Sequence, residues 1–361
     1  MVEISSDQLA LESLLLDICQ TPSPTFAEQA RAALIKQLFE GAGFASEQDD
    51  TGNVIAELPG GTGPRVLLAA HLDTVFPLET DVMVKRAEAR WMAPGLGDNS
   101  ASLAVLVHYL QNLPAKRPRL TVAATVGEEG VGNLYGMREL MRVQKLRADK
   151  VIAVDGHLGT IVDQSVGSRR FSITVKAKGG HSWGDYPSPS ATHALGDMIH
   201  NLSRLSVPRE PRSSLNIGQV SGGTSINAIA QEASFNLDLR SLDEGVLAGL
   251  EREARNRILK VSRQHEVQAD IELIGDRPAG KGPNDALVHT AKEVLRELEI
   301  FPRTAASSTD ANIPMSQGIP AIAFGVYTGG DAHRLSEWLE PASLLKGYRA
   351  LVLLLERLAD S

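Results

Sequence analysis

The chain has 361 residues, of which 43% are hydrophobic and 22% are charged, the balance of an ordinary globular protein. Its formal net charge of −8 argues against nucleic acid or an anionic membrane as the main partner. The chain is longer than a domain built around one ordinary hydrophobic core, so two domains are expected.

Two helices are predicted near the amino terminus, over residues 7–20 and 28–40. The first is acidic and carries apolar residues at helical spacing, unlike a signal or transit peptide. No apolar run approaches the roughly 20 residues that a membrane span requires. The only cysteine, Cys19, fits a reducing compartment. We therefore expect a cytoplasmic protein without a membrane partner.

A pair of adjacent glutamates, Glu128 and Glu129, follows a strand predicted over residues 120–126. Adjacent carboxylates repel each other, so a site that keeps both charged usually holds a cation beside them. One carboxylate can then bind the metal while the other moves a proton. The alternative is a pair of solvated glutamates on a turn. Other candidate ligands after neighbouring strands make this alternative the weaker one.

Two of these candidates occur earlier in the chain. His71 follows a strand predicted over residues 65–70, and the carboxylate of Asp73 can hold its second ring nitrogen and so fix the tautomer. Asp98 precedes a helix predicted over residues 100–110. It is either the N-cap of that helix or a carboxylate held between two cations.

Two further candidates lie downstream. Asp155 follows a strand predicted over residues 151–154, and His333 lies in the glycine-rich stretch 329–333. Junctions between strands and helices are where open α/β sheets collect their ligands. A mixed set of histidines and carboxylates suits Zn, Co or Mn rather than Ca or Mg.

The pattern changes between residues 167 and 274. Strands are predicted over residues 171–177, 213–220, 233–240 and 267–273, and helices over 191–205 and 243–264. This β-α-β-β-α-β order is ferredoxin-like. After Gly275 the α/β pattern returns, with a helix over 285–298, a strand over 321–324 and a helix over 341–358.

The predicted fold is therefore a catalytic α/β domain with a mixed sheet flanked by helices. Residues 1–166 and 275–361 form the two parts of this domain. A ferredoxin-like α+β domain, residues 167–274, interrupts it.

The motifs HLDT, GLGDN, GEEG, VDG and GGDAH, in this order, resemble those of the M20 family of di-metal aminoacyl hydrolases across essentially the whole chain. That family includes peptidase T-like aminopeptidases, glutamate carboxypeptidases and N-acyl-amino-acid deacylases. The resemblance implies two divalent metal ions per chain, Zn first, with Co or Mn as alternatives. It assigns His71 and Asp155 to one ion, Glu129 and His333 to the other, and Asp98 to the bridge between them.

The resemblance also assigns roles around these ligands. Glu128 is similar to the family's general base, which takes a proton from the bridging water and passes it to the leaving amine. Asp73 is similar to the carboxylate that orients His71. The family further implies a cis peptide bond between Asp98 and Asn99.

For the inserted domain, the resemblance implies a lid and the interface of a homodimer. His181 matches a lid histidine that stabilises the oxyanion, in its own subunit or in the partner's. Asn227 and Arg240 match residues that bind the carboxylate end of the substrate, for which a planar guanidinium is well suited. Trp183 and Tyr186 either line the pocket or pack in the dimer seam.

The stretches GGHSWGDYPSPSATHAL and SSTDANIP resemble the peptidase T-like branch. The predicted function is hydrolysis of short peptides by an aminopeptidase acting on di- and tripeptides. The alternatives are an N-acyl-amino-acid deacylase or a carboxypeptidase of the same family, and, from another class, a non-catalytic binding homologue. A nucleotide-binding oxidoreductase is disfavoured. The glycine-containing stretches 41–43 and 60–63 are the candidates for a dinucleotide-binding loop, but neither follows a strand and begins a helix.

Overall fold

The computed structural model describes residues 5–142 and 147–360. The chain divides into two compact units, one formed by Met1–Ser165 with Lys281–Ser361 and the other by Val166–Gly280. Each unit has its own hydrophobic core. Among the described residues, none of the helices has both the length and the apolar character needed to cross a bilayer.

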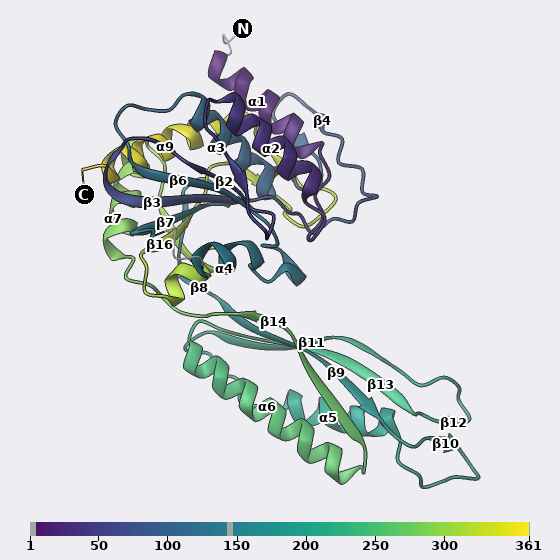
Figure 1. The fold of residues 1–361 in the computed structure, drawn as a ribbon. Helices are drawn as coiled ribbons and strands as arrows, with labels where there is room; N and C mark the ends of the chain where they lie inside the picture. Colours follow the sequence, from purple (N-terminus) through teal and green to yellow (C-terminus); the bar gives the residue numbers. More distant parts are fainter. Residues whose placement is uncertain (1–4, 143–146, 361) are drawn as a thin grey trace. The chain divides into compact units, whose positions relative to one another are not determined.

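An eight-stranded sheet forms the centre of the larger unit, with strand order β1-β2-β6-β3-β7-β16-β8-β15 (Figure 1). The strands are β1 (Glu47–Gln48), β2 (Val54–Glu57), β3 (Thr62–His71), β6 (Pro118–Thr125), β7 (Lys150–Val154), β8 (Thr160–Ser165), β15 (Arg303–Ser307) and β16 (Ala321–Phe324). The central strands β6, β3, β7 and β16 are parallel, whereas β2 and β8 run antiparallel to their neighbours β6 and β16. The mixed sheet confirms the predicted fold class.

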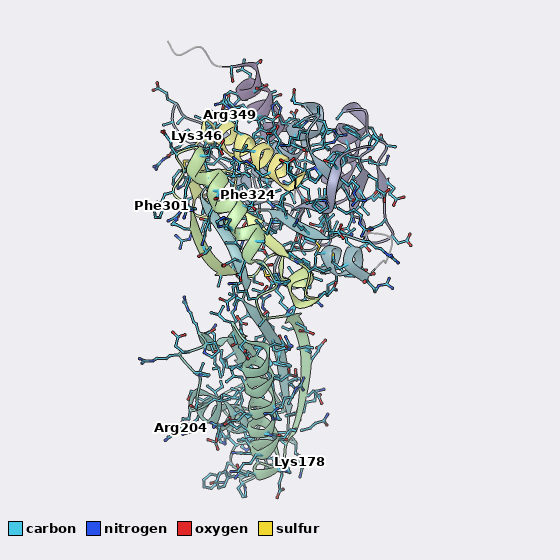
Figure 2. The ribbon with its side chains drawn as sticks, turned by 90° about the vertical axis from the view of Figure 1, so that its left-hand side faces the viewer. Lys178, Arg204, Phe301, Phe324, Lys346 and Arg349 are labelled. Carbon is cyan, nitrogen blue, oxygen red and sulfur yellow. The ribbon has the colours of Figure 1, made fainter. Side chains whose placement is uncertain are left out.

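Helices cover both faces of this sheet. They are α1 (Ser6–Cys19), α2 (Gln29–Gly41), α3 (Ser102–Gln111), α4 (Tyr135–Arg142), α7 (Asp285–Glu297), α8 (Asn312–Ser316) and α9 (Ser343–Leu358). The core on one face contains residues of α1, α2, α3, α7 and α9, and the core on the other face contains residues of α4 and α8. Figure 2 shows Phe324 inside this unit and Phe301 at its surface.

Strand β3 shows why the sequence predicted such a sheet. Val66, Leu68 and Ala70 belong to one core, and Leu67 and Ala69 belong to the other. A strand buried on both faces has no polar side to show, so it reads as a continuous apolar run.

The second unit contains a four-stranded antiparallel sheet with order β11-β13-β9-β14. Its elements in chain order are β9 (Gly167–Lys176), α5 (Ala191–Ser203), β11 (Ser213–Gly222), β13 (Glu232–Ser241), α6 (Glu244–Gln264) and β14 (Gln268–Arg277). Both helices pack on one face of the sheet (Figure 1). This is the predicted β-α-β-β-α-β order. A two-stranded ribbon joins β10 (Gly180–His181) to β12 (Ala228–Ile229).

A second small sheet lies in the larger unit and has the order β17-β18-β5-β4. Its strands are β4 (Lys85–Arg86), β5 (Trp91–Met92), β17 (Gly329–Gly330) and β18 (Trp338–Leu339). This sheet pairs the segment before Asp98 with the segment on either side of His333.

Candidate metal centre

The candidate ligands meet at one edge of the large sheet. His71 is the last residue of β3, and the pairing of β3 with β6 sets it opposite Thr125. Asp155 follows β7, which is parallel to β3 on its other side. Because parallel strands end at the same edge, side chains that follow them converge there.

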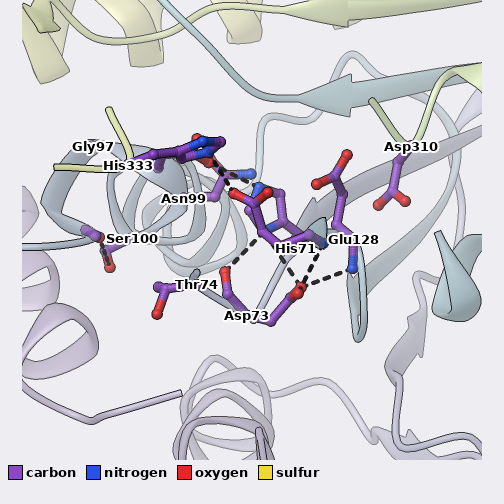
Figure 3. Close-up of polar contacts among 12 residues, drawn as sticks. His71, Asp73, Thr74, Gly97, Asn99, Ser100, Glu128, Asp310 and His333 are labelled. Atoms are coloured by element: carbon purple, nitrogen blue, oxygen red, sulfur yellow. Dashed lines mark hydrogen bonds and ion pairs between the residues drawn. The ribbon is translucent and has the colours of Figure 1, made fainter. Parts of the chain in front are cut away.

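Asp98 lies within hydrogen-bond distance of both His71 and His333, two histidines that are labelled in Figure 3. Its Oδ1 is 3.0 Å from Nε2 of His71, and its Oδ2 is 3.1 Å from Nε2 of His333. Nε2 of His333 is also 2.8 Å from Oε1 of Glu129. Three groups of described residues have ligand atoms within 4.8 Å of one another, and two of them are His71 with Asp98 and Asp155, and Asp98 with Glu129 and His333. These two groups share one residue, Asp98, as the two halves of a bridged di-metal site would.

The pKa values of several side chains in this centre are strongly shifted. Burial, together with the nearby charge of Asp98, raises the pKa of Asp155 to about 7. Burial opposes protonation of His71, yet its hydrogen bonds to Asp73 and Asp98 raise its pKa well above the usual value. Hydrogen bonds to Asp98 and Glu129 raise the pKa of His333 to about 11. A cluster of carboxylates that favours protonation of nearby histidines also favours the binding of divalent cations.

The donor set fits a pair of divalent transition-metal ions. Imidazole nitrogens and carboxylate oxygens suit Zn, Co and Mn. The free cysteine, Cys19, is buried and its Sγ faces the carbonyl oxygens of Val82 and Pro94, so it is not among the grouped donors of the described residues.

Asp73 connects the histidine to the glutamate pair. Its Oδ1 accepts the backbone N–H of Glu128 at 2.9 Å, and its Oδ2 accepts that of Glu129 at 2.9 Å and the hydroxyl of Thr25 at 2.9 Å. Nδ1 of His71 lies 3.0 Å from the backbone carbonyl oxygen of Asp73 and 3.6 Å from its carboxylate. The same residue therefore contacts the ligand histidine and holds the turn that carries both glutamates.

Glu128 is buried at the same turn and belongs to a third group of ligand atoms, with His71 and Glu129. The turn is tight: Gly127 has a φ of +62°, and a side chain there would contact Tyr135 at 3.2 Å. Glu28 accepts the backbone N–H of Gly127 at 3.0 Å. Sequence reasoning missed this role of Glu28, because nothing in its neighbourhood marks it as an acceptor for a turn 99 residues away.

The peptide bond between Asp98 and Asn99 is cis, which confirms the prediction made from the resemblance. Asn99 donates to the carbonyl oxygen of Val154 at 3.0 Å. The alternative role of Asp98 as a helix N-cap is wrong, because α3 begins at Ser102 and is preceded by Ala101. Asp98 and Asn99 have non-helical backbone angles, which delays the start of the helix.

Glu337 is a second residue that the sequence analysis missed. It is 1% exposed, and its carboxylate accepts the backbone N–H groups of Gly95 (2.9 Å), Gly97 (2.8 Å) and Asp98 (2.8 Å). It lies four residues after His333, and its partners are backbone groups 239–242 residues earlier in the chain, so the fold is needed to reveal them.

The other candidates lie in the second unit. Nδ1 of His181 accepts the backbone N–H groups of Trp183 (3.3 Å) and Gly184 (3.2 Å). The carbonyl oxygen of Asn227 accepts the N–H of Ser182 at 3.0 Å, which ties these two loops together.

Arg240 lies on β13 and donates through Nε to Asp238 at 2.9 Å. Trp183 and Tyr186 are 89% and 78% exposed within the chain, so neither belongs to the core of its own unit.

Comparison with known proteins identifies the family that this chain matches. The model of peptidase family M20/M25/M40 matches residues 67–357. Among individual relatives, succinyl-diaminopimelate desuccinylase of Corynebacterium glutamicum is 25% identical, over 96% of this chain and 97% of its own length. Cytosol non-specific dipeptidase of Escherichia coli is 28% identical, over 66% of this chain and 55% of its own length.

Solved structures share the fold. A tripeptidase of Staphylococcus aureus superposes with a TM-score of 0.84 at 24% identity, and aminopeptidase PepT of Bacillus cereus with 0.81 at 23%. Each comparison covers 98% of this chain and 99% of the other. The YXEP protein of Bacillus subtilis, a dinuclear metal-binding peptidase, gives 0.71 at 18%, over 98% of this chain and 99% of its own.

Proposed function

The chain belongs to peptidase family M20/M25/M40 and is a hydrolytic enzyme, and on that premise we propose that it is an aminopeptidase acting on di- and tripeptides. The observation that carries the hydrolytic part of the proposal is the position of Asp98, with one carboxylate oxygen beside His71 and the other beside His333. The similarity to cytosol non-specific dipeptidase of E. coli supports short peptides as substrates. A carboxylate shared in this way suits a pair of metal ions at one catalytic centre.

We assign His71 and Asp155 to one ion, Glu129 and His333 to the other, and Asp98 to both. Zn is the proposed metal, and Co or Mn suits the same donors. When bound, the two ions supply a water activated near neutral pH and a polarised substrate carbonyl.

Glu128 is the proposed general base. Its backbone N–H is held by Asp73, so the residue that contacts His71 also positions the base. Glu128 takes a proton from the attacking water and delivers it to the amine that leaves when the C–N bond breaks. Glu128 is buried, so its electrostatic interactions are stronger than they would be in water.

The second unit is the proposed lid. Because Nδ1 of His181 accepts two backbone N–H groups, the proton of the neutral ring lies on Nε2. That N–H is a fixed donor suited to an oxyanion on the substrate. Asn227 and Arg240 are the proposed contacts for the substrate's carboxylate end, which a guanidinium binds with charge-assisted hydrogen bonds.

We also propose that the second unit, residues 167–274 as first delimited from the sequence, joins two chains into a homodimer. Strand β11 lies at an edge of its sheet, and an edge strand offers unpaired backbone groups to a second copy. A cytoplasmic location completes the proposal, and the similarity to the cytosol dipeptidase of E. coli supports it.

A second candidate function is removal of an N-acyl group from an amino acid. The similarity to succinyl-diaminopimelate desuccinylase over nearly the whole chain favours it. Both activities break an amide bond, and in both the substrate already carries a free carboxylate end that Arg240 can bind. They differ in whether the substrate begins with a free ammonium or with an acyl group.

One panel of substrates separates the two. Hydrolysis of di- and tripeptides is measured beside N-acetyl and N-succinyl amino acids, each with Zn, Co or Mn. The proposal expects kcat/KM for peptides with a free amino end to exceed that of their N-acetylated forms by at least about 100-fold, corresponding to the loss of one buried charged contact. Faster turnover of the N-acyl substrates would replace the aminopeptidase by the deacylase.

A further inference from the structure

Glu337 links the two loops that carry the bridging aspartate and the histidine of the second group. The loop before Asp98 runs from Gly95 to Gly97, and Glu337 accepts a backbone N–H from both glycines and from Asp98 itself. On the other side, Glu337 lies four residues after His333, and its own N–H donates to the carbonyl oxygen of Arg334 at 3.0 Å.

The backbone around Glu337 fixes the two loops a second time. Its carbonyl oxygen accepts the N–H of Ala93 at 3.1 Å, and the next residues form β18, which pairs with β5 just before the loop. The side chain and the strand pairing therefore hold one loop against the other. In Figure 3, Gly97 and His333 lie on the same side of the site.

The chemistry of this arrangement points towards the metal site rather than towards general stability. A carboxylate that is 1% exposed is costly to bury unless its oxygens are satisfied, and here three backbone N–H groups satisfy them without a cation. One of those N–H groups belongs to Asp98, whose side chain reaches both histidines. A shift of this backbone would move both carboxylate oxygens of Asp98 together.

We propose that Glu337 is a positioning residue that holds the Asp98 carboxylate between the two metal ions. The proposal rests on the proposed di-metal function and adds a residue to it. Partners beyond the direct ligands orient those ligands, and their loss typically lowers metal affinity by about 10–100-fold.

The test measures metal binding by the variant E337Q. The glutamine side chain has nearly the same size but keeps a single acceptor oxygen, so at least one of the three N–H groups loses its partner. Metal-free protein is titrated with Co²⁺ against a competing chelator, and the visible absorption of the bound ion reports its coordination. We expect the affinity to fall by at least about 10-fold and the absorption spectrum to change.

Asp49→Asn is the control. Oδ1 of the half-buried Asp49 also accepts three backbone N–H groups, from Thr51, Gly52 and Asn53, in the same unit, and Oδ2 accepts the side-chain amide of Asn53. It is not among the grouped metal donors of the described residues. A purely structural role for Glu337 predicts that E337Q lowers the melting temperature of the metal-free protein but, like D49N, binds Co²⁺ as the wild type does.

The outcomes separate this inference from the proposed function. If wild-type protein binds two ions and E337Q binds them equally well with the same spectrum, the role of Glu337 is refuted and the metal site stands. If the wild type binds no pair of ions, both fall together. Should E337Q fail to fold, E337D takes its place. Its side chain is one methylene shorter and cannot reach all three N–H groups, so the same loss of affinity is expected and an unchanged affinity would again refute the role.

Discussion

The carboxylate of Asp73 accepts a hydrogen bond of 2.9 Å from the backbone N–H of Glu128. Two strands bring these residues together, because Asp73 follows β3 and Glu128 follows β6. The pairing of β3 with β6 thus decides where the proposed base lies relative to the proposed metal ligands.

Glu128→Gln tests the proposed base. The substitution keeps the shape and the backbone hydrogen bond to Asp73, but the new amide cannot take up a proton. We expect kcat to fall by at least about 10²-fold, the usual contribution of a general base, while the metal content stays unchanged. Steady-state kinetics and elemental analysis on the same samples measure both.

Glu129→Gln is the matched comparison, since the two glutamates are neighbours and both are buried. It should lower the metal content, because Glu129 is grouped with Asp98 and His333. If Glu129→Gln kept its metal and lost only rate, and Glu128→Gln lost metal, the two roles would have to be exchanged.

His71→Ala tests the metal centre. We expect wild-type protein freed of loosely held ions to contain up to two metal ions per chain, and His71→Ala to lose one ion and nearly all turnover. His289→Ala is the control, because His289 is an exposed histidine that lies beside Glu293 of the same helix. Activity that survives removal of metal by a strong chelator would contradict the di-metal mechanism.

The raised pKa of Asp155 predicts that the thermal stability of the metal-free protein depends on pH. Burial raises its pKa from 3.8 to about 7 in the folded state, so folding favours its protonated form. The stabilisation from that proton is complete below about pH 4 and is lost progressively as the pH rises through about 7. Asp155→Asn carries no ionisable group, so its melting temperature relative to the wild type should be higher at about pH 8 than at about pH 5.

Thermal melts of both proteins in a chelator, at several pH values between about 5 and 8, provide the measurement. At about pH 8, added metal should raise the melting temperature of the wild type more than that of Asp155→Asn, because only the wild type has a carboxylate ligand at this position. A melting difference that does not vary with pH would mean that Asp155 is not the titrating group.

Arg240→Ala tests the carboxylate contact. Only a peptide with a free carboxylate loses a charge-assisted pair, so KM should rise much more for free peptides than for their C-terminal amides. Arg252→Ala, an exposed arginine of α6 in the same unit, serves as the control. Equal losses on the two kinds of substrate would remove this role from Arg240.

The sequence predicted the central parallel strands β6, β3, β7 and β16 well. Strands β3, β6 and β7 are apolar runs, and a candidate ligand lies at or just after the end of each. No strand was predicted over β2, β8 or β15, and both β8 and β15 contain small or polar residues. Their pairing is with strands distant in the chain, and no local pattern announces such partners.

The site could be predicted in part for a related reason. Histidine and carboxylate ligands are recognisable by residue type and position after a strand. Glu28 and Glu337 are not, because each acts on backbone N–H groups of a remote turn. Asp73 was expected to orient His71, but its contact with both residues of the glutamate pair depends on which strand lies beside β3. That is a property of the assembled sheet.

The position of β8 has a consequence for biosynthesis. Its two neighbours in the sheet, β15 and β16, come from the stretch 303–324, and His333 follows them. While the inserted unit is being translated, β8 therefore has no strand to pair with, and the proposed second metal site lacks one ligand. The larger unit can close its sheet only after its carboxyl-terminal part has left the ribosome. The proposed group of Asp98, Glu129 and His333 can thus be completed only after residue 333 has been synthesised, whereas His71, Asp98 and Asp155 all precede the inserted unit.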